Sequence, residues 1–264
     1  MPPKMTTDIV IPAYSGNMDD VQNNTPTLYS FLEENFSKIQ WRITIAYNGN
    51  SSTEIPRLIA FAKKYPRVRL TRVEKAGKGA AILNAINETK ASILIYLDAD
   101  MATNITALPA LFQKMIDEEA DIVSGSRYHP QSTIRRNPTR LLVSWVYTHI
   151  FLRMIGARFT DPQCGFKAIR VGTIRDILPY VKDSWFFFES ELELVAQRRG
   201  LKIVEIPIDW KEMTNSSVKL VPTIVNFLGN MKRMMFDTPE KSEPEWVAPV
   251  HLLKEAKPDL SKPN

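Results

Sequence analysis

The stretch Ile93-Leu94-Ile95-Tyr96-Leu97-Asp98-Ala99-Asp100 joins an apolar run to two carboxylates. The apolar run predicts a buried strand, and open α/β sheets bind ligands at the carboxyl ends of such strands. Two acids separated by one residue project to the same side of an extended chain. Asp98 and Asp100 therefore suit a hard divalent cation such as Mg²⁺, which binds through carboxylates and substrate phosphates. Capping of a following helix near Thr103 and Asn104 is the alternative.

Strand and helix patterns alternate on both sides of this stretch. Strands are expected at 8–12, 41–47, 68–73, 92–97 and 121–125, and helices at 26–39, 53–65, 78–90 and 108–119. This alternation indicates βαβ units and an α/β fold with a largely parallel sheet. The second half is less regular, with helices expected at 139–156, 188–199 and 220–236 and strands at 165–170 and 202–210. We expect one domain over 1–236, followed by a disordered, proline-rich and charged tail over 237–264.

The composition suits a globular protein without disulfide bonds. The 264 residues are 44% hydrophobic and 24% charged, with a single cysteine, Cys164. One cysteine excludes an internal disulfide framework and fits a reducing compartment. The short polar start does not resemble a signal peptide, and no stretch approaches the roughly 18 uninterrupted apolar residues of a membrane span. We therefore expect a cytoplasmic protein whose contact with a membrane is peripheral.

Positive charge is concentrated in the body of the chain. The net charge is +5, but the tail over 237–264 holds four lysines and six acids, so the remaining residues carry +7. Residues 126–160 contain six arginines with neither an acid nor a lysine, and residues 213–236 contain three basic residues and no acid. Such clusters indicate an anionic partner: phosphate, a lipid surface or nucleic acid. Nucleic acid is the least favoured, because no binding motif for it accompanies the arginines.

A glycine-containing loop, Lys75-Ala76-Gly77-Lys78-Gly79, opens the helix that leads to the Asp98 strand. Its glycines let the backbone approach a ligand, and two lysines at a helix N-terminus favour an anion. The spacing matches neither a P-loop nor the dinucleotide-binding fingerprint. A plain turn with a glycine hinge is the alternative.

The order of these motifs resembles that of a known family. The segments 9–14, 75–79 with Asn84, 98–100 and 125–127 are similar to the nucleotide-sugar half of family 2 glycosyltransferases, which have the GT-A fold. Further along, 161–167 and 188–192 resemble the acceptor half of the polyprenyl-phosphate branch, and 209–212, 216–217 and 219–222 look most like dolichyl-phosphate glucosyltransferases. The resemblance covers residues 8–236. It implies a nucleotide-sugar half over 8–125 and an acceptor half over 126–236.

The resemblance also implies where the donor binds. Asp98 and Asp100 would contact the ribose and a divalent metal, Mg²⁺ or Mn²⁺, which neutralises the departing nucleoside diphosphate. Asn48 stands where the family usually has an acid, so it would pair with the base, uridine or guanosine. Reaction at the anomeric carbon would invert its configuration. The donor-binding residues would be Pro12, Ala13, Tyr14, Asn48, Lys75, Gly77, Lys78, Gly79, Asp98, Ala99 and Asp100.

The acceptor implied by the resemblance is a lipid phosphate. It is already ionised and needs to be held in line rather than deprotonated, so arginine forks suit it. Asp161 and Glu191 are expected near the reacting centre, and they complete a catalytic set with Asp100 and Arg127. In the alternative, Asp161 caps a turn, Glu191 lies on a helix face and some of the arginines only face solvent. The residues expected to contact the acceptor phosphate are Arg127, Arg135, Arg136, Arg140 and Lys219.

We expect an inverting, metal-dependent transferase that moves a hexose to a polyprenyl or dolichyl phosphate. The leading hypothesis for the donor is UDP-glucose, and GDP-mannose or a non-lipid acceptor are the alternatives. The basic amphipathic helices at 139–156 and 220–236 suit the cytosolic face of a membrane, although core packing explains Trp145 and Phe151 equally well. Outside the enzymes, the alternative is a catalytically silent protein that binds a nucleotide-sugar or an anionic lipid.

Overall fold

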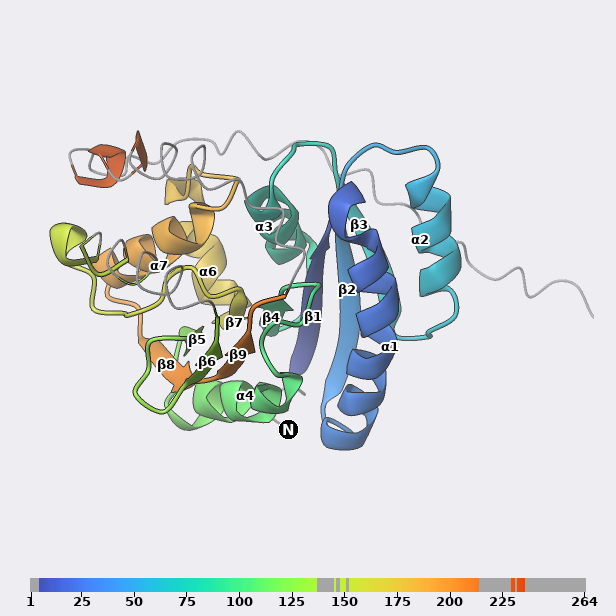
Figure 1. Cartoon of the computed structure of the whole chain (residues 1–264), viewed down its shortest axis with the longest axis horizontal. Helices are drawn as coiled ribbons and strands as arrows, with labels where there is room; N and C mark the ends of the chain where they lie inside the picture. Colours follow the sequence, from blue (N-terminus) through green and yellow to red (C-terminus); the bar gives the residue numbers. More distant parts are fainter. Residues whose placement is uncertain are drawn as a thin grey trace, which may run out of the picture.

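The computed structural model describes residues 5–136, 145, 148–150, 152–213, 229–230 and 232–235 (Figure 1). The strands are β1 (Thr6–Ala13), β2 (Gln40–Asn48), β3 (Val68–Val73), β4 (Ile93–Leu97), β5 (Ile122–Ser126), β6 (Thr133–Arg135), β7 (Phe166–Arg170), β8 (Ile203–Pro207) and β9 (Asp209–Lys211). The α-helices are α1 (Met18–Asn35), α2 (Glu54–Ala62), α3 (Lys78–Glu88), α4 (Leu108–Asp117), α6 (Val171–Ile177) and α7 (Phe188–Arg198). Short 3-10 helices are η1 (Ser15–Asn17), η2 (Ile105–Ala107) and η3 (Leu178–Tyr180).

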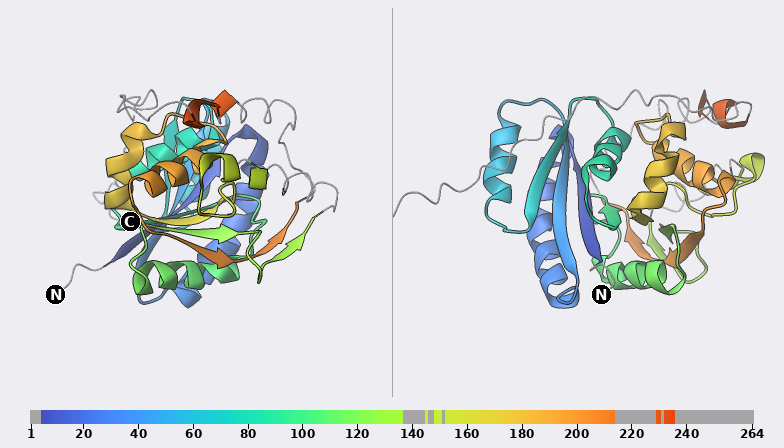
Figure 2. Two further views of the ribbon diagram at one scale, coloured as in Figure 1. Left: turned by 90° about the vertical axis from the view of Figure 1, so that its left-hand side faces the viewer. Right: turned by 180° about the vertical axis from the view of Figure 1, so that it is seen from behind.

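Seven strands form one sheet in the order β3-β2-β1-β4-β7-β5-β8. Every neighbouring pair is parallel except the two pairs of β7, which runs antiparallel to β4 and to β5. The mixed, mostly parallel sheet that the sequence predicts is therefore confirmed. The two short strands β6 and β9 pair with each other in a separate sheet that projects beyond the large one (Figure 2).

Helices cover both faces of the large sheet (Figures 1 and 2). Ile9 and Ile11 of β1 belong to the hydrophobic cluster that includes α1, α2 and α4, whereas Val10 belongs to the cluster with α3, α6 and α7. Successive strand residues point to opposite faces, so a strand buried on both sides is apolar at every position. Burial of each such side chain contributes about 1.5–3 kcal/mol, which explains why the central strands are continuous apolar runs.

The first helix begins earlier than the sequence predicts. We expected it to start at Pro26, but α1 begins at Met18 and contains Pro26 in its interior. Proline inside a helix removes one backbone hydrogen bond at a cost of about 3 kcal/mol. The buried side chains of Val21, Leu28 and Leu32 offset that cost by packing the helix along its length. Packing of the whole helix therefore outweighs the local signal of the proline.

The second half differs from the prediction in two places. The expected strand over 202–210 is broken, because β8 ends at Pro207, whose ring nitrogen cannot donate to a ladder. The chain then continues as β9, which pairs with β6 in the small sheet. The helix α6 follows β7 directly and was not predicted, since its β-branched residues Val171, Thr173 and Ile174 favour strands.

The two basic segments expected to meet a membrane are only partly described. Residues 148–150 and 152–155 are helical, as are 229–230 and 232–235. Arg140, Lys219 and the tail over 237–264 lie outside the described residues. Within the described part of the chain, no helix has both the length and the apolar character needed to cross a bilayer.

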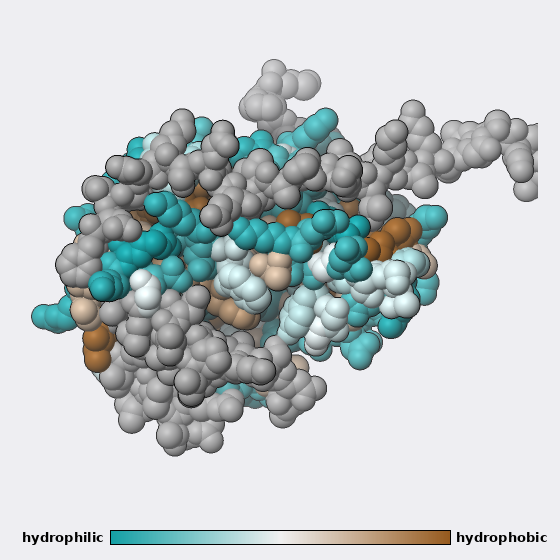
Figure 3. Space-filling model, turned by 90° about the horizontal axis from the view of Figure 1, so that it is seen from above, coloured by the Kyte–Doolittle hydropathy of each residue, from teal (hydrophilic) through white to brown (hydrophobic). Residues whose placement is uncertain are grey.

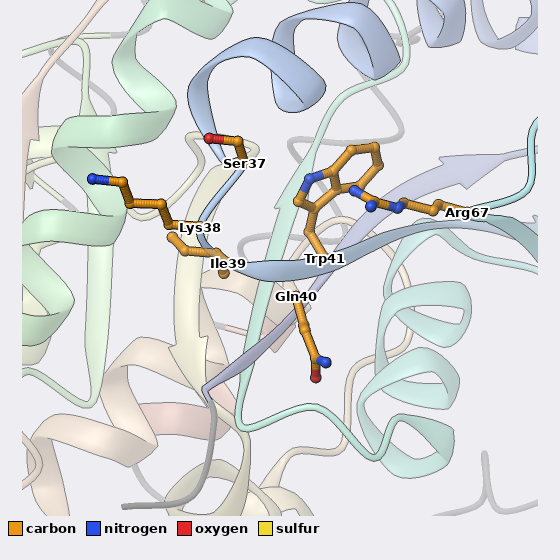
Figure 4. A pocket seen from close by; sticks show the side chains of 6 residues that line it. All are labelled: Ser37, Lys38, Ile39, Gln40, Trp41 and Arg67. Carbon is orange, nitrogen blue, oxygen red and sulfur yellow. The ribbon is translucent and has the colours of Figure 1, made fainter.

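A surface pocket lies at the amino end of β2, which is the edge of the sheet opposite Asp98 (Figure 4). The Arg67 guanidinium lies over the Trp41 ring there, 4.6 Å from its centre. None of the residues predicted to bind donor or acceptor lines this pocket. The lining residues are Ser37, Lys38, Ile39, Gln40, Trp41 and Arg67.

Candidate active site

The topology brings the predicted motifs to one edge of the sheet. The parallel strands β1, β2, β4 and β5 end at this edge, and the antiparallel β7 begins there. Asp98 follows β4, Arg127 follows β5, and Gly165 precedes β7, whose Phe166 pairs with Leu97. Segments that are up to 70 residues apart in the chain therefore meet at the carboxyl end of β4, as expected for α/β sheets.

Asp98 is held by a lysine that it shares with a second acid. Lys78 Nζ lies 2.6 Å from Asp98 Oδ1 and 3.3 Å from Glu189 Oε1. Burial alone would lower the pKa of Lys78, but the two carboxylates raise it, so the ammonium stays charged. The Asp98 side chain is 41% exposed and Glu189 is buried. Glu189, which lies in the 188–192 motif but was not among the predicted site residues, thus becomes part of the site.

Asp100 shares the negative potential of Asp98. Its Oδ1 accepts a hydrogen bond from the Ala102 N–H, at 3.1 Å. Burial, and then repulsion by the neighbouring Asp98 carboxylate, raise the pKa of Asp100. An oxygen-only pair with excess negative charge fits a hard divalent cation that also takes phosphate oxygens. No cluster of three or more potential ligands occurs among the described residues.

Because Gly165 has no side chain, the Asp98 carboxylate can occupy the space beside it. A Cβ atom at position 165 would lie 2.2 Å from Asp98 Oδ2, which is impossible without displacing the carboxylate. This contact joins the donor half to the Cys164-Gly165-Phe166 segment of the acceptor half. The sequence showed the glycine within a motif, but its contact with Asp98 depends on the pairing of β4 with β7.

The loop over 75–79 packs against the segment before α7. The Ala80 N–H donates to the Ser184 carbonyl at 2.8 Å, and the Gly79 N–H donates to the Trp185 carbonyl at 3.2 Å. Gly77 has a φ of 133°, and a Cβ there would lie 2.1 Å from the Ser184 carbonyl oxygen. The expectation that the α3 N-terminus is open to an anion is therefore wrong for these two amides, because protein carbonyls already accept from them.

Asn48 fastens this loop to the end of β2. Its side-chain amide donates to the Lys75 carbonyl, and its Oδ1 accepts from the Gly77 N–H at 3.1 Å. Both ends of the amide are thus engaged with the backbone of the loop, and its contact with a nucleobase stays a prediction. At the end of β1, Asn17 binds the Pro12 carbonyl and the Tyr14 N–H in a similar way, while the Tyr14 ring is exposed.

Arg127 and Asp161 form a buried bidentate pair. Arg127 Nε and Nη2 lie 2.7 and 2.8 Å from the two Asp161 carboxylate oxygens, and the Arg127 N–H also donates to Asp161. Burial would raise the pKa of Asp161, but the arginine outweighs burial and lowers it. Asp161 is therefore ionised in this structure, and its carboxylate holds the Arg127 guanidinium in position.

Trp210 lies next to two of the predicted phosphate-binding arginines. The guanidinium carbons of Arg127 and Arg136 are 5.5 and 5.7 Å from the Trp210 ring centre. Arg136 also pairs with Glu212 at 3.2 Å, and Arg135 is exposed on β6. Trp210 was not predicted as a site residue, and the only sequence signal for it is its place in the 209–212 motif.

Glu191 faces away from this cluster toward the described C-terminal helical residues. Its Oε1 lies 2.6 Å from Arg233 Nη1, and its Oε2 accepts from the Asp183 N–H at 2.7 Å. The side chain is fully buried. The structure thus joins Asp98, Lys78 and Glu189 in one group and Arg127, Asp161, Trp210 and Arg136 in another, and it places Glu191 in a third group with Asp183 and Arg233.

Solved structures share this architecture. Mannosyl-3-phosphoglycerate synthase from Rubrobacter xylanophilus superposes with a TM-score of 0.63 at 15% identity, covering 91% of this chain and 78% of that one. Glucosyl-3-phosphoglycerate synthase from Mycobacterium tuberculosis, in a complex with Mn²⁺, UDP and glucosyl-3-phosphoglycerate, gives 0.57 at 16% identity, covering 88% and 77%. At this identity the likeness concerns the fold, and it confirms the predicted GT-A architecture.

Curated relatives are similar over most of this chain. A dolichyl-phosphate beta-glucosyltransferase of Trichomonas vaginalis is 29% identical over 83% of this chain and 68% of its own length. Glycosyltransferase AglD of Haloferax volcanii is 27% identical over 82% of this chain, which spans only 35% of that protein. An undecaprenyl-phosphate mannosyltransferase of Micrococcus luteus is 30% identical over 59% of this chain and 65% of its own length.

The sequence pattern of one protein family matches the segment that contains most of the candidate site. The sequence pattern of Glycosyl transferase family 2 matches residues 8–178, which include β1, the Lys75–Gly79 loop, Asp98, Asp100, Arg127 and Asp161. Since the match covers more than half of the chain, the protein belongs to glycosyltransferase family 2.

Proposed function

We propose that this chain transfers a hexose from a nucleotide-sugar to a polyprenyl or dolichyl phosphate, with inversion at the anomeric carbon. The observation that carries the proposal is the meeting of the Asp98 and Asp100 carboxylates with the Arg127 group at one sheet edge. Two of the relatives are named for transfer to a dolichyl or undecaprenyl phosphate, which supports a lipid phosphate as the acceptor.

Asp98 and Asp100 would hold a divalent cation at the donor diphosphate. When bound, the cation neutralises the charge that develops on the nucleoside diphosphate as it leaves. Lys78 pairs with both Asp98 and Glu189, and Gly165 leaves room for the Asp98 carboxylate. Mg²⁺ and Mn²⁺ both fit an oxygen-only pair, and the Mn²⁺ in the glucosyl-3-phosphoglycerate synthase supports Mn²⁺ as the first ion to test.

Arg127 and Arg136, both next to the Trp210 ring, would bind the acceptor phosphate. Asp161 accepts from Nε and Nη2 of Arg127 and so fixes the guanidinium plane, which leaves Nη1 and the second N–H of Nη2 to donate to phosphate oxygens. A phosphate monoester is ionised at neutral pH, so no side chain has to remove a proton from the nucleophile. Asp161 would thus act by orienting Arg127, while Glu191 stays a candidate without an observed contact to this group.

UDP-glucose is our proposed donor, and GDP-mannose is the alternative. Relatives named beta-glucosyltransferase favour glucose, whereas the Micrococcus luteus relative is named a mannosyltransferase. Pro12, Ala13, Tyr14 and the Asn48 loop would face the nucleoside. We further propose peripheral association with the cytosolic face of a membrane, because the acceptor is a lipid and the 126–160 segment is rich in arginine.

The test is the release of nucleoside diphosphate by the full chain. UDP-glucose and GDP-mannose would each be supplied with Mg²⁺ or Mn²⁺, with and without a polyprenyl phosphate in detergent. Release that needs both the metal and the lipid phosphate, and that is lost in Asp100→Asn, supports the proposal and names the donor. Release at the same rate with and without the polyprenyl phosphate, or equal stimulation by a small phosphorylated acceptor, contradicts the proposal.

A further inference from the structure

Two consecutive aromatic residues are exposed in the loop that leads into α7. Trp185 is 50% exposed and Phe186 is 36% exposed, whereas Phe187 and Phe188 are fully buried. Single exposed apolar residues are ordinary. Packing among the described residues does not explain why two neighbouring large rings face away from the core while the next two face it.

The backbone of this loop is fixed on both sides. The Trp185 N–H donates to Asp183 Oδ1 at 2.8 Å, and the carbonyls of Ser184 and Trp185 accept from the α3 N-terminus. Gln163 Nε2 donates to the Phe186 carbonyl at 3.3 Å. The two rings are therefore displayed by a loop that is already ordered, so binding through them would cost little conformational entropy.

The loop lies beside the donor end of the candidate site. The Ser184 carbonyl lies against Gly77. Lys78, which follows Gly77 in the chain, pairs with Asp98. Anything that binds the Trp185 and Phe186 rings is thus placed near the sheet edge where the transfer is proposed. Figure 3 looks onto the molecule from above, where hydrophilic residues surround separate hydrophobic ones.

The charges around the two rings are basic where they are exposed. Lys182 is exposed just before the loop, and Asn230, two residues before the exposed Lys232, donates to Asp183 Oδ2 at 3.1 Å. The acids here, Asp183 and Glu191, are buried and hydrogen-bonded. Aromatic rings with flanking lysines match the interface of an anionic membrane, where rings sit at headgroup level and cations meet lipid phosphates.

We infer that Trp185 and Phe186 form a lipid-contacting wedge that seats the protein on an anionic membrane surface next to its donor loop. The inference deepens the proposed function and rests on it, because a lipid-borne acceptor has to be presented from such a surface. The wedge fixes the height and orientation of the sheet edge relative to the headgroups. It differs from the amphipathic segments predicted from sequence, since it comes from a rigid loop between η3 and α7.

The first experiment measures sedimentation of the full chain with vesicles of phosphatidylcholine, with and without phosphatidylserine. We expect wild type to bind the anionic vesicles and the variant Trp185→Ser/Phe186→Ser to bind about tenfold more weakly or worse, since burial of one such ring alone exceeds 1.4 kcal/mol. Met5→Ser is the matched control, because Met5 is 41% exposed beside the start of β1, at the opposite edge. Equal unfolding temperatures would show that each variant is folded.

The second experiment separates this inference from the proposed function. Transfer would be compared for a long polyprenyl phosphate in vesicles and a short, water-soluble isoprenyl phosphate. We expect the ratio of the two kcat/KM values to fall about tenfold in the double variant, as for the binding. Wild-type vesicle binding in the double variant, or no vesicle binding by wild type, overturns the wedge. Wedge-dependent vesicle binding without transfer to either acceptor overturns only the proposed function.

Discussion

Lys78 is shared between two carboxylates, and this sharing predicts opposite effects of two substitutions. A cation that binds Asp98 Oδ1 must displace Lys78, whose ammonium can then move to Glu189, only 3.3 Å away. In Glu189→Gln the Lys78 ammonium has Asp98 as its one anionic partner and competes more strongly with the cation. We therefore expect the Mn²⁺ affinity to fall about tenfold or more. In Lys78→Met the competitor is gone, so Mn²⁺ should bind at least as tightly as to wild type. Calorimetric titration with Mn²⁺ measures both.

The control for this pair is Glu118→Gln, which removes an exposed carboxylate from a surface pair with Lys114. It changes the net charge as Glu189→Gln does, but at the C-terminal end of α4, which precedes the start of β5 and so lies at the sheet edge opposite Asp98. Mn²⁺ affinity should be unchanged in this variant. A loss of affinity in both glutamine variants would mean that overall charge, and not the position of Lys78, sets the affinity.

Glu193 gives the protein a predicted pH dependence of stability. Burial raises the pKa of Glu193 from 4.5 to about 7, although Lys167 and the Ser124 hydroxyl oppose the shift. The folded state then binds a proton that the unfolded state has lost, so the free energy of unfolding should fall as the pH rises from about 4.5 to about 7. The slope is at most about 1.4 kcal/mol per pH unit. Urea unfolding at several pH values should show this slope for wild type and a flatter profile for Glu193→Gln.

At the scale of elements, the buried Glu191–Arg233 pair joins α7 to the helical residues 232–235. Arg233→Met leaves the Glu191 carboxylate buried without its cation, and we expect a loss on the order of 3 kcal/mol, moderated because Arg233 is 23% exposed. Glu191→Gln/Arg233→Met removes both charges while the glutamine oxygen still accepts from the Asp183 N–H. The double variant should therefore be more stable than Arg233→Met alone. Chemical unfolding of wild type, both single variants and the double variant tests this. Losses of unfolding free energy that simply add up in the double variant would contradict it.

The elements themselves were largely predictable, and their contacts were not. Periodicity located β3 at 68–73 and α7 close to its observed bounds, because those patterns are local. The Asp98 and Asp100 pair could be predicted from two acids after a buried strand. The roles of Gly165, Glu189 and Trp210 could not, because each depends on a neighbour at least 67 residues away that only the sheet order brings near. Asn48 shows the same limit, since its amide binds a loop, whereas the resemblance to the family implied a base contact.

For the whole molecule, the large sheet runs without a break through both predicted halves. The boundary between 8–125 and 126–236 falls within β5, and β7 of the second half is inserted between β4 and β5 of the first. Without the second half, β4 would lose its pairing with β7 over five consecutive residues, and β5 would lose both β7 and β8. The donor half therefore has no complete core of its own.

This continuity predicts how fragments behave. A fragment over 5–125 would expose the unpaired edge of β4 and the face that α7 covers, so we expect it to aggregate or to lack a cooperative unfolding transition. A fragment over 5–213 keeps all seven strands and should unfold cooperatively. Circular dichroism and tryptophan fluorescence during urea unfolding would be compared for both fragments. A cooperative transition in the shorter fragment would show that the nucleotide-sugar half folds alone, and that the acceptor half is an addition to a finished domain.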